Sequence, residues 1–346
     1  MSQQGSGGVS RRALVASLSA GAALSLAGCG VRLERDAPQV PGLRTQDPPA
    51  DQDTLLATLG ALQRLVRTAE STDPALSPWV GPLLTMHRSQ VSRLVDVMAG
   101  LGIDVPSVAG SSSRPPAPAP STTPSGSGTS PAPPSGAQET PPPTTTTRSP
   151  GSTSLASDVA ALARAEQDVP ASAGLGAAWS AEPTNRAMLL ALGVTRHAAV
   201  RVLGASPAMA YGSVPAAASA TPLAQAIRPA VYGFEVIAAR TPTDQRALVT
   251  STLGWLYGAR SALDAVLEEP ARPSYRLPVQ VTDQASARRL AQALLGSVAR
   301  AAASQVTPTA AQGQARRDWL VRVWSLAAAD GWQWGTPPEP FPGLTL

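Results

Sequence analysis

Three side chains in the N-terminal half are of the types that bind metal ions or transfer protons. The chain has two histidines, His87 and His197, and Glu166 lies on the apolar face of an expected helix between them. Two imidazoles and one carboxylate would hold a transition metal with one coordination position left open. The alternative is a hydrogen-bonded core in which ionised Glu166 pairs with a histidine or an arginine, because burying such groups unpaired is costly. We expect the second arrangement, with no cofactor and no metal ion.

A short apolar segment near the N-terminus predicts export. Arg11 and Arg12 place positive charge before residues 13–27, which are almost entirely small or apolar. This run is too short to cross a bilayer core of about 30 Å as a permanent helix, so residues 1–28 are typical of a secretory signal peptide. The letters SRRALV also resemble a twin-arginine motif, and general secretion remains the alternative route.

The single cysteine directly follows this segment. Leu26, Ala27, Gly28 and Cys29 resemble a bacterial lipobox, in which the cysteine thiol receives diacylglycerol and becomes the first mature residue. We therefore expect a lipoprotein whose Cys29 carries a fatty-acyl (palmitate) anchor on the extracytoplasmic side of the cell membrane. Residues 29–52 contain several prolines and no periodicity, which predicts a tether.

The composition and the absence of certain motifs argue against nucleic-acid binding and against catalysis. Arginine carries all the positive charge, and 27 basic against 23 acidic residues give a formal net charge of +4. These charges are interspersed and do not alternate with aromatic residues, so we expect no nucleic-acid partner. The sequence also lacks a glycine-rich phosphate loop and a nucleophilic serine between a strand and a helix. We expect a protein that is not an enzyme.

Residues 106–152 interrupt the N-terminal half. They consist mainly of Pro, Ser, Thr and Gly, with almost no large apolar side chains. Such a segment cannot bury enough surface to offset its conformational entropy, so the composition predicts a disordered insertion. Serine and threonine beside proline are also typical of O-glycosylated stalks, which leaves glycosylation open.

Elsewhere the apolar residues recur at helical spacing. The expected helices cover residues 54–69, 80–98, 155–169 and 182–203, and then residues 222–240, 242–268, 284–306 and 308–329. Thr-Pro pairs at 221–222, 241–242 and 307–308 are expected to begin three of the last four, because Thr caps amides and Pro presets φ. The sequence predicts an all-α fold of two antiparallel four-helix bundles, at residues 53–205 and 220–336.

The C-terminal half resembles a known family. AVYGFEVIAAR, YRLPVQVTD, ARRLAQALLGSVARAAA and RRDWLVRVWSLAAADGW are similar to the ferritin-like domain of unknown function found in actinobacterial lipoproteins. The resemblance covers residues 220–336 and implies a helical bundle, an envelope location and no established activity. Dinuclear ferritin-like sites use a Glu-x-x-His motif on each of two helices. Here the residues three before the histidines are Leu84 and Val194, so the glutamate of each motif is missing.

Aromatic residues gather near the C-terminus. Trp319 and Trp324 are expected to pack inside the bundle, whereas Trp332 and Trp334 could form a face for an envelope protein or a glycan. The proline-rich tail, residues 337–346, is expected to fold back over the bundle. The expected function is a non-catalytic binding or scaffold role outside the membrane. The alternatives are a degenerate metal-binding or redox protein using the N-terminal helices, and a carrier of a small apolar ligand.

Overall fold

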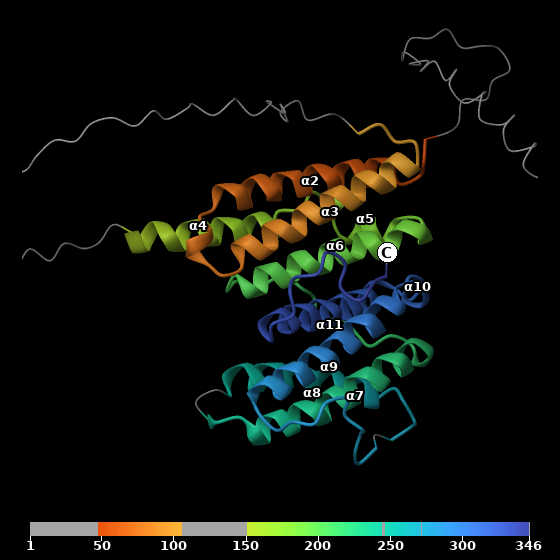
Figure 1. The fold of residues 1–346 in the computed structure, drawn as a ribbon. Coiled ribbons are helices and arrows are strands. Elements are labelled where there is room, and N and C mark those ends of the chain that lie inside the picture. Colours follow the sequence, from red (N-terminus) through yellow and green to blue (C-terminus); the bar gives the residue numbers. More distant parts are fainter. Residues whose placement is uncertain (1–47, 106–150, 244–245, 271, 346) are drawn as a thin grey trace, which may run out of the picture. The chain divides into compact units, whose positions relative to one another are not determined.

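The computed structural model describes residues 48–105, 151–243, 246–270 and 272–345. Throughout these ranges the regular elements are helices (Figure 1), so the predicted all-α fold class is confirmed. The predicted signal peptide, with Arg11, Arg12, Leu26, Ala27, Gly28 and Cys29, lies outside the described residues, as does most of the tether. The segment predicted to be disordered also lies outside them, apart from its last two residues, which begin a helix.

The first set of helices comes from the N-terminal half. It comprises α2 (Gln52–Ser71), η1 (Pro74–Leu76), α3 (Val80–Gly100), α4 (Gly151–Gln167), η2 (Ala171–Ala173), α5 (Leu175–Ser180) and α6 (Pro183–Val202). Helix α2 packs on α3 and α4, and α4 packs on α6. The buried side chains of α2, among them Leu55, Leu59 and Leu62, recur at helical spacing as the sequence predicts.

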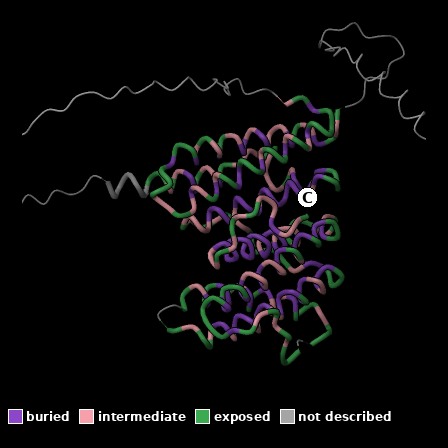
Figure 2. Tube along the Cα trace, in the orientation of Figure 1, coloured by how far each residue is buried: buried purple, intermediate pink, exposed green. Residues whose placement is uncertain are grey.

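The second set comes from the C-terminal half. It comprises α7 (Ala217–Arg240), α8 (Ala247–Asp264), α9 (Gln284–Ser304), the one-turn α10 (Val306–Thr309) and α11 (Gln314–Gln333). Helix α7 packs on α8 and α9, and α11 lies between α9 and α6 (Figure 1). Helices α6 and α11 are therefore buried along most of their length (Figure 2). One hydrophobic core runs through both sets, so the two expected bundles share their interior.

The prediction that three Thr-Pro pairs begin helices is wrong. Helix α7 begins at Ala217, and the Thr221 hydroxyl donates a hydrogen bond to the Ala217 carbonyl at 3.0 Å. The first pair, Thr221–Pro222, therefore lies one turn inside the helix. Thr241 is the C-terminal cap of α7, and its hydroxyl donates to the Ile237 carbonyl at 2.8 Å. The third pair, Thr307–Pro308, lies within the one-turn helix α10, and α11 begins only at Gln314. A threonine that bonds backward to the preceding turn extends an existing helix and caps no new one.

Helix α9 does begin where the sequence predicts. The Asp283 carboxylate accepts a hydrogen bond from the Ser286 amide at 2.7 Å, and the Ser286 hydroxyl lies 3.0 Å from the Asp283 amide. These reciprocal contacts form a capping box, which satisfies amides that the first turn of a helix leaves unpaired.

The C-terminal tail returns between the two sets of helices. The Trp324 indole donates to the Pro342 carbonyl at 2.9 Å, and the Gln90 amide donates to the Pro340 carbonyl at 2.8 Å. Gly343 adopts a φ of 76°, and a Cβ at this position would lie 2.7 Å from the backbone of Ala299. Side chains of both sets of helices thus donate hydrogen bonds to the backbone of the tail and fix its position.

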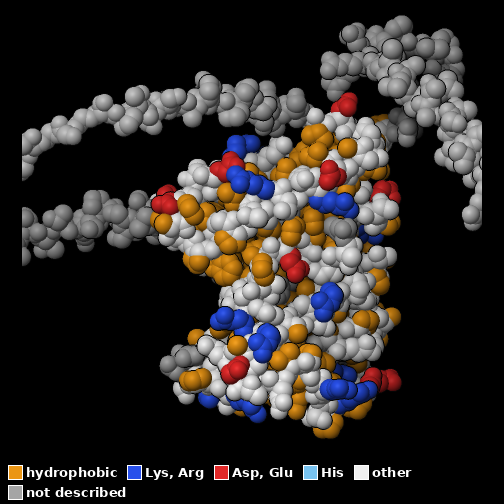
Figure 3. All heavy atoms as spheres, viewed as in Figure 1, with side chains coloured by type: hydrophobic (Ala, Val, Ile, Leu, Met, Phe, Trp, Pro, Cys, Tyr) orange, Lys and Arg blue, Asp and Glu red, His pale blue; other side chains and the backbone are white. Residues whose placement is uncertain are grey.

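The described surface is mixed in character. On the face shown in Figure 3, arginines and acidic side chains alternate with apolar ones over both sets of helices. In the described ranges, no helix is long and apolar enough to cross a membrane.

Candidate functional site

His87 and Glu166 meet in the interior of the N-terminal helices. His87 on α3 places Nε2 2.7 Å from Oε1 of Glu166, in the last turn of α4, and both side chains are 0% exposed. Each residue occupies a position on the apolar face of its helix, with Leu83 and Met86 near His87 and Leu162 near Glu166 also buried. The sequence-based expectation of a hydrogen-bonded pair involving these two residues agrees with this geometry.

Gln90 determines which atoms of His87 carry protons. It lies one turn after His87, with its Oε1 2.9 Å from His87 Nδ1. Its amide nitrogen donates to Thr195 Oγ1 and to the Pro340 carbonyl, both at 2.8 Å. The Thr195 hydroxyl itself donates to the Leu192 carbonyl at 2.9 Å, which leaves its oxygen free to accept. The Gln90 orientation is therefore fixed, and His87 Nδ1 must be an N–H group.

The electrostatic surroundings favour a charged His87. Burial by itself lowers the pKa of His87, but the charge of Glu166 and the hydrogen bonds with Glu166 and Gln90 outweigh it. The pKa of His87 consequently lies above its ordinary value of 6.5, although the charge of Arg196 opposes the rise. An imidazolium donating from both ring nitrogens to Gln90 and ionised Glu166 fits these contacts.

Arg196 on α6 closes the end of α4. Its Nε donates to the Glu166 carbonyl at 3.0 Å, and its Nη2 donates to the carbonyls of Ala165 at 2.9 Å and Asp168 at 3.3 Å. Ala165 and Glu166 lie in the last turn of α4, where a helix leaves its carbonyls without intrahelical partners, and Asp168 follows the helix, so the guanidinium serves as a C-terminal cap. Arg196 Nε also lies 3.8 Å from Oε2 of Glu166, which gives the carboxylate a second positive neighbour. Burial lowers the pKa of Arg196, and the charge of Glu166 opposes this shift.

His197 does not join His87 and Glu166 in a ligand set. Burial, followed by the charge of Arg196, lowers the pKa of His197 to about 4, so the imidazole is neutral at pH 7. Among the residues that the structure describes, no three His, Cys, Asp or Glu side chains are grouped so as to hold a metal ion. Of the three sequence-predicted candidates, only His87 and Glu166 are in direct contact.

A cavity of about 190 Å³ adjoins Glu166. It is lined by residues of α2, α4, α6 and the segment between α4 and α6: Thr58, Leu62, Glu166, Gln167, Val169, Ala173, Gly174, Leu175, Leu189, Leu192, Gly193, Arg196 and His197, with Ala208. Within the described part of the chain, three polar atoms of these residues are buried without a hydrogen-bond partner: Thr58 Oγ1, Glu166 Oε2 and His197 Nδ1. Sequence reasoning missed Thr58, because a single threonine on an amphipathic helix carries no pattern that distinguishes it.

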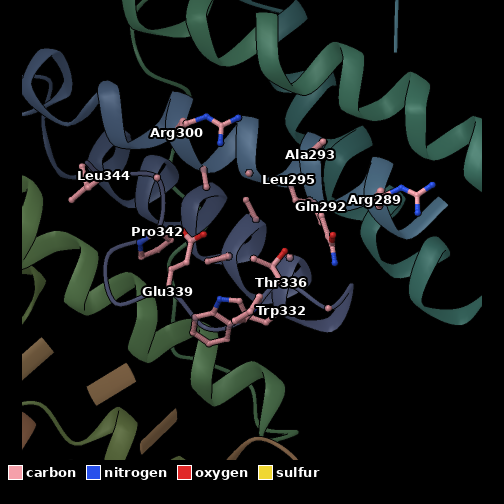
Figure 4. Close-up of a pocket in the computed structure, with 18 of the residues that line it drawn as sticks. Arg289, Gln292, Ala293, Leu295, Arg300, Trp332, Thr336, Glu339, Pro342 and Leu344 are labelled. Carbon is pink, nitrogen blue, oxygen red and sulfur yellow. The ribbon is translucent and has the colours of Figure 1, made fainter. Parts of the chain in front are cut away.

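A larger recess of about 560 Å³ lies between α9, α11 and the tail (Figure 4). Arg289 and Arg300 of α9 and Glu339 of the tail contribute its charged side chains. Trp332 lines this recess but is only 2% exposed, so it packs in the interior and does not form the possible aromatic partner face considered from the sequence. Trp334 is half-buried and packs edge-on against Phe234, with ring centroids 5.6 Å apart.

The structure thus defines an all-helical protein with a buried polar centre and an adjoining cavity. Residues 218–346, from α7 through the tail, match the model of a family described as a domain of unknown function (DUF4439). No curated protein and no solved structure matches the chain. The C-terminal helices therefore contain a recognised domain, and the polar centre with its cavity lies mainly in the helices that precede it.

Proposed function

We propose that the chain is a cell-envelope lipoprotein, anchored through diacylglycerol on Cys29, with a non-catalytic helical unit that binds or organises partners outside the membrane. The observation that carries this proposal is the sequence Leu26-Ala27-Gly28-Cys29 after an apolar run preceded by two arginines. A lipid-anchored protein needs no membrane-spanning segment, and none of the described helices is suited to be one.

A structural role for the polar centre supports the non-catalytic part of the proposal. His87 and Glu166 are the described pair that most resembles an acid and a base, but both side chains are fully buried. Both ring nitrogens of His87 are occupied, by Gln90 and by Glu166. A general base must reach the proton that it removes, so this pair is better suited to holding α3, α4 and α6 together.

Metabolic labelling tests the anchor. Cells fed an alkyne analogue of palmitate should label the wild-type chain and a Gly30→Ala control, but not Cys29→Ala, because the thiol is the acylated atom. Mass spectrometry should place the mature N-terminus at Cys29. An epitope inserted within residues 106–152 should be accessible to antibody on intact cells. An unlabelled chain that retains its first 28 residues would refute the proposal.

The export route is distinguished in the same cells. A paired substitution, Arg11→Lys with Arg12→Lys, preserves the positive charge but removes the paired arginines. Loss of labelling in this variant would assign the twin-arginine route, and unchanged labelling would assign general secretion.

A further inference from the structure

The recess between α9, α11 and the tail holds two side chains of opposite charge that do not pair with each other. Arg300 extends from α9 on one side, and Glu339 extends from the tail on the other (Figure 4). In the described part of the chain, neither side chain forms an ion pair or a hydrogen bond. Both side chains are exposed, so a molecule in the recess can reach them.

The guanidinium of Arg300 is the cation best placed for a ligand. Its Nη1 lies 3.4 Å from the position that a Cβ of Gly296 would occupy, one turn earlier in α9, and both residues line the recess. Arg289 is placed differently. The hydrogen bonds of Ser286 and, more weakly, the charge of Arg289 lower the pKa of Asp283, so Arg289 already has a carboxylate near it.

The carboxylate of Glu339 is carried by an ordered backbone. Pro338 and Pro340 flank Glu339, and a proline fixes its own φ and restricts the residue before it. The Pro340 carbonyl also accepts a hydrogen bond from the Gln90 amide at 2.8 Å. Binding at Glu339 therefore costs little additional backbone entropy, which favours affinity.

The floor of the recess consists of small residues on the facing sides of α9 and α11: Ala293, Gly296, Ala299, Ala327, Ala328 and Gly331. The volume of about 560 Å³ is typical of ligand-binding sites. Between Gln292 and Ala299, α9 rises about 10 Å, at about 1.5 Å per residue, which is the length of about three residues of extended peptide.

The two charges select the class of ligand. An anion alone would also meet Glu339, and a cation alone would also meet Arg300, whereas a molecule with one charge of each sign can pair with both side chains. We propose that the recess binds a short zwitterionic peptide with small side chains, whose terminal carboxylate pairs with Arg300 and whose terminal ammonium pairs with Glu339.

Gln292 offers a third contact. Its amide nitrogen donates to the Trp334 carbonyl at 3.0 Å, which leaves its oxygen able to accept from a peptide N–H group. The proposal does not depend on the lipid anchor, because the recess lies within residues 218–346 and the anchor concerns Cys29.

Binding of three matched peptides tests the proposal. The full-length chain carrying Cys29→Ala is titrated with trialanine, with N-acetyl-trialanine and with trialanine amide, and binding is followed by calorimetry. Trialanine should bind saturably. Each blocked peptide should bind about fivefold more weakly, because the acetyl group removes the positive charge and the amide removes the negative charge.

Two variants assign each end of the peptide to its side chain. Arg300→Gln should weaken trialanine about fivefold and leave trialanine amide unchanged, because the amide lacks the carboxylate that the arginine binds. Glu339→Gln should weaken trialanine about fivefold and leave N-acetyl-trialanine unchanged. The matched controls are Arg93→Gln on α3 and Glu268→Gln after α8, which are exposed residues outside the recess and should bind all three peptides like the parent.

A third variant fills the recess. Gly296→Leu should abolish binding of all three peptides, and it should preserve the fold, because the flexible Arg300 side chain is the only group near the added Cβ. Gly254→Leu is the control at a glycine of α8 that also faces open space, and it should not affect binding. If Gly296→Leu loses its helical circular dichroism, Arg300→Gln and Glu339→Gln decide the question.

Four results would overturn the proposal. They are the lack of saturable trialanine binding up to about 10 mM, equal affinities for trialanine and both blocked peptides, equal weakening of trialanine and its amide by Arg300→Gln, and full binding by a folded Gly296→Leu variant. The last result would place the bound peptide elsewhere on the molecule.

Discussion

Replacing His197 by glutamine should remove a defined part of the pH dependence of stability. In the folded chain the pKa of His197 is about 4, against 6.5 for the unperturbed side chain. Between these values the unfolded chain binds a proton at His197 and the folded chain does not, so lowering the pH favours unfolding. The difference of 6.5 − 4 = 2.5 pKa units corresponds to about 3 kcal/mol at 1.36 kcal/mol per unit.

The assay is urea unfolding followed by circular dichroism at several pH values from 8 to 4. The stability of the parent relative to His197→Gln should be constant above about pH 7 and then decline by about 3 kcal/mol as the pH falls to 4. The constant region above pH 7 is the internal control, since His197 is neutral there in both states. Parallel curves for the two proteins over the whole range would refute the burial and charge argument.

His87 should act in the opposite direction. Its pKa in the folded chain is raised above 6.5, so its stabilising contribution is complete below that pH and is lost as the pH rises through the folded pKa. Because the chain has two histidines, their ring signals can be assigned with the His197→Gln variant alone. The signal that remains in this variant belongs to His87 and should titrate above pH 6.5. In the parent protein, the second signal belongs to His197 and should titrate near pH 4.

Three further substitutions probe the polar centre and the tail. Glu166→Gln should cost about 3–5 kcal/mol in urea unfolding at pH 6, because it leaves a buried imidazolium without its counter-charge; a cost near zero would contradict the ion pair. Gln90→Leu should cost about 2 kcal/mol and speed amide hydrogen exchange in residues 337–345, because the Pro340 carbonyl loses its donor; unchanged exchange there would contradict the attachment. Gly343→Ala should destabilise the protein more than the control Gly102→Ala. Both glycines have positive φ (76° and 70°), but an added Cβ meets the Ala299 backbone only at Gly343. Equal shifts in the thermal unfolding midpoint would contradict the close approach.

The sequence predicts helices well because apolar periodicity is a local property. The four expected N-terminal helices match α2, α3, α4 and α6 to within a few residues. The predicted beginnings of α7, α8 and α11 differ from the observed ones, because a Thr-Pro pair can end, extend or begin a helix. Whether the pair ends, extends or begins a helix depends on whether the residues before it are already helical, and the packing of the helices determines this.

The candidate site could be predicted only in part. His87 and Glu166 each stand on an apolar stripe, and burial in pairs follows from the cost of isolating either group. The contributions of Thr195 and Pro340 could not be predicted, because they meet Gln90 across 105 and 250 residues of sequence. The near-complete burial of α11 also exceeds what its own pattern suggests, because α6 covers one side and α9 the other.

The polar centre also explains how the order of packing is specified. Apolar contacts between α3, α4 and α6 tolerate small shifts, since leucine and alanine side chains have no directional partners. The His87–Glu166 pair does not tolerate them, because its desolvation is offset only when Gln90, Thr195 and the Pro340 carbonyl all reach their partners. A tail in the wrong register would leave the Gln90 amide unsatisfied in the interior. The buried network therefore links correct packing of the N-terminal helices to correct docking of the last residues of the chain.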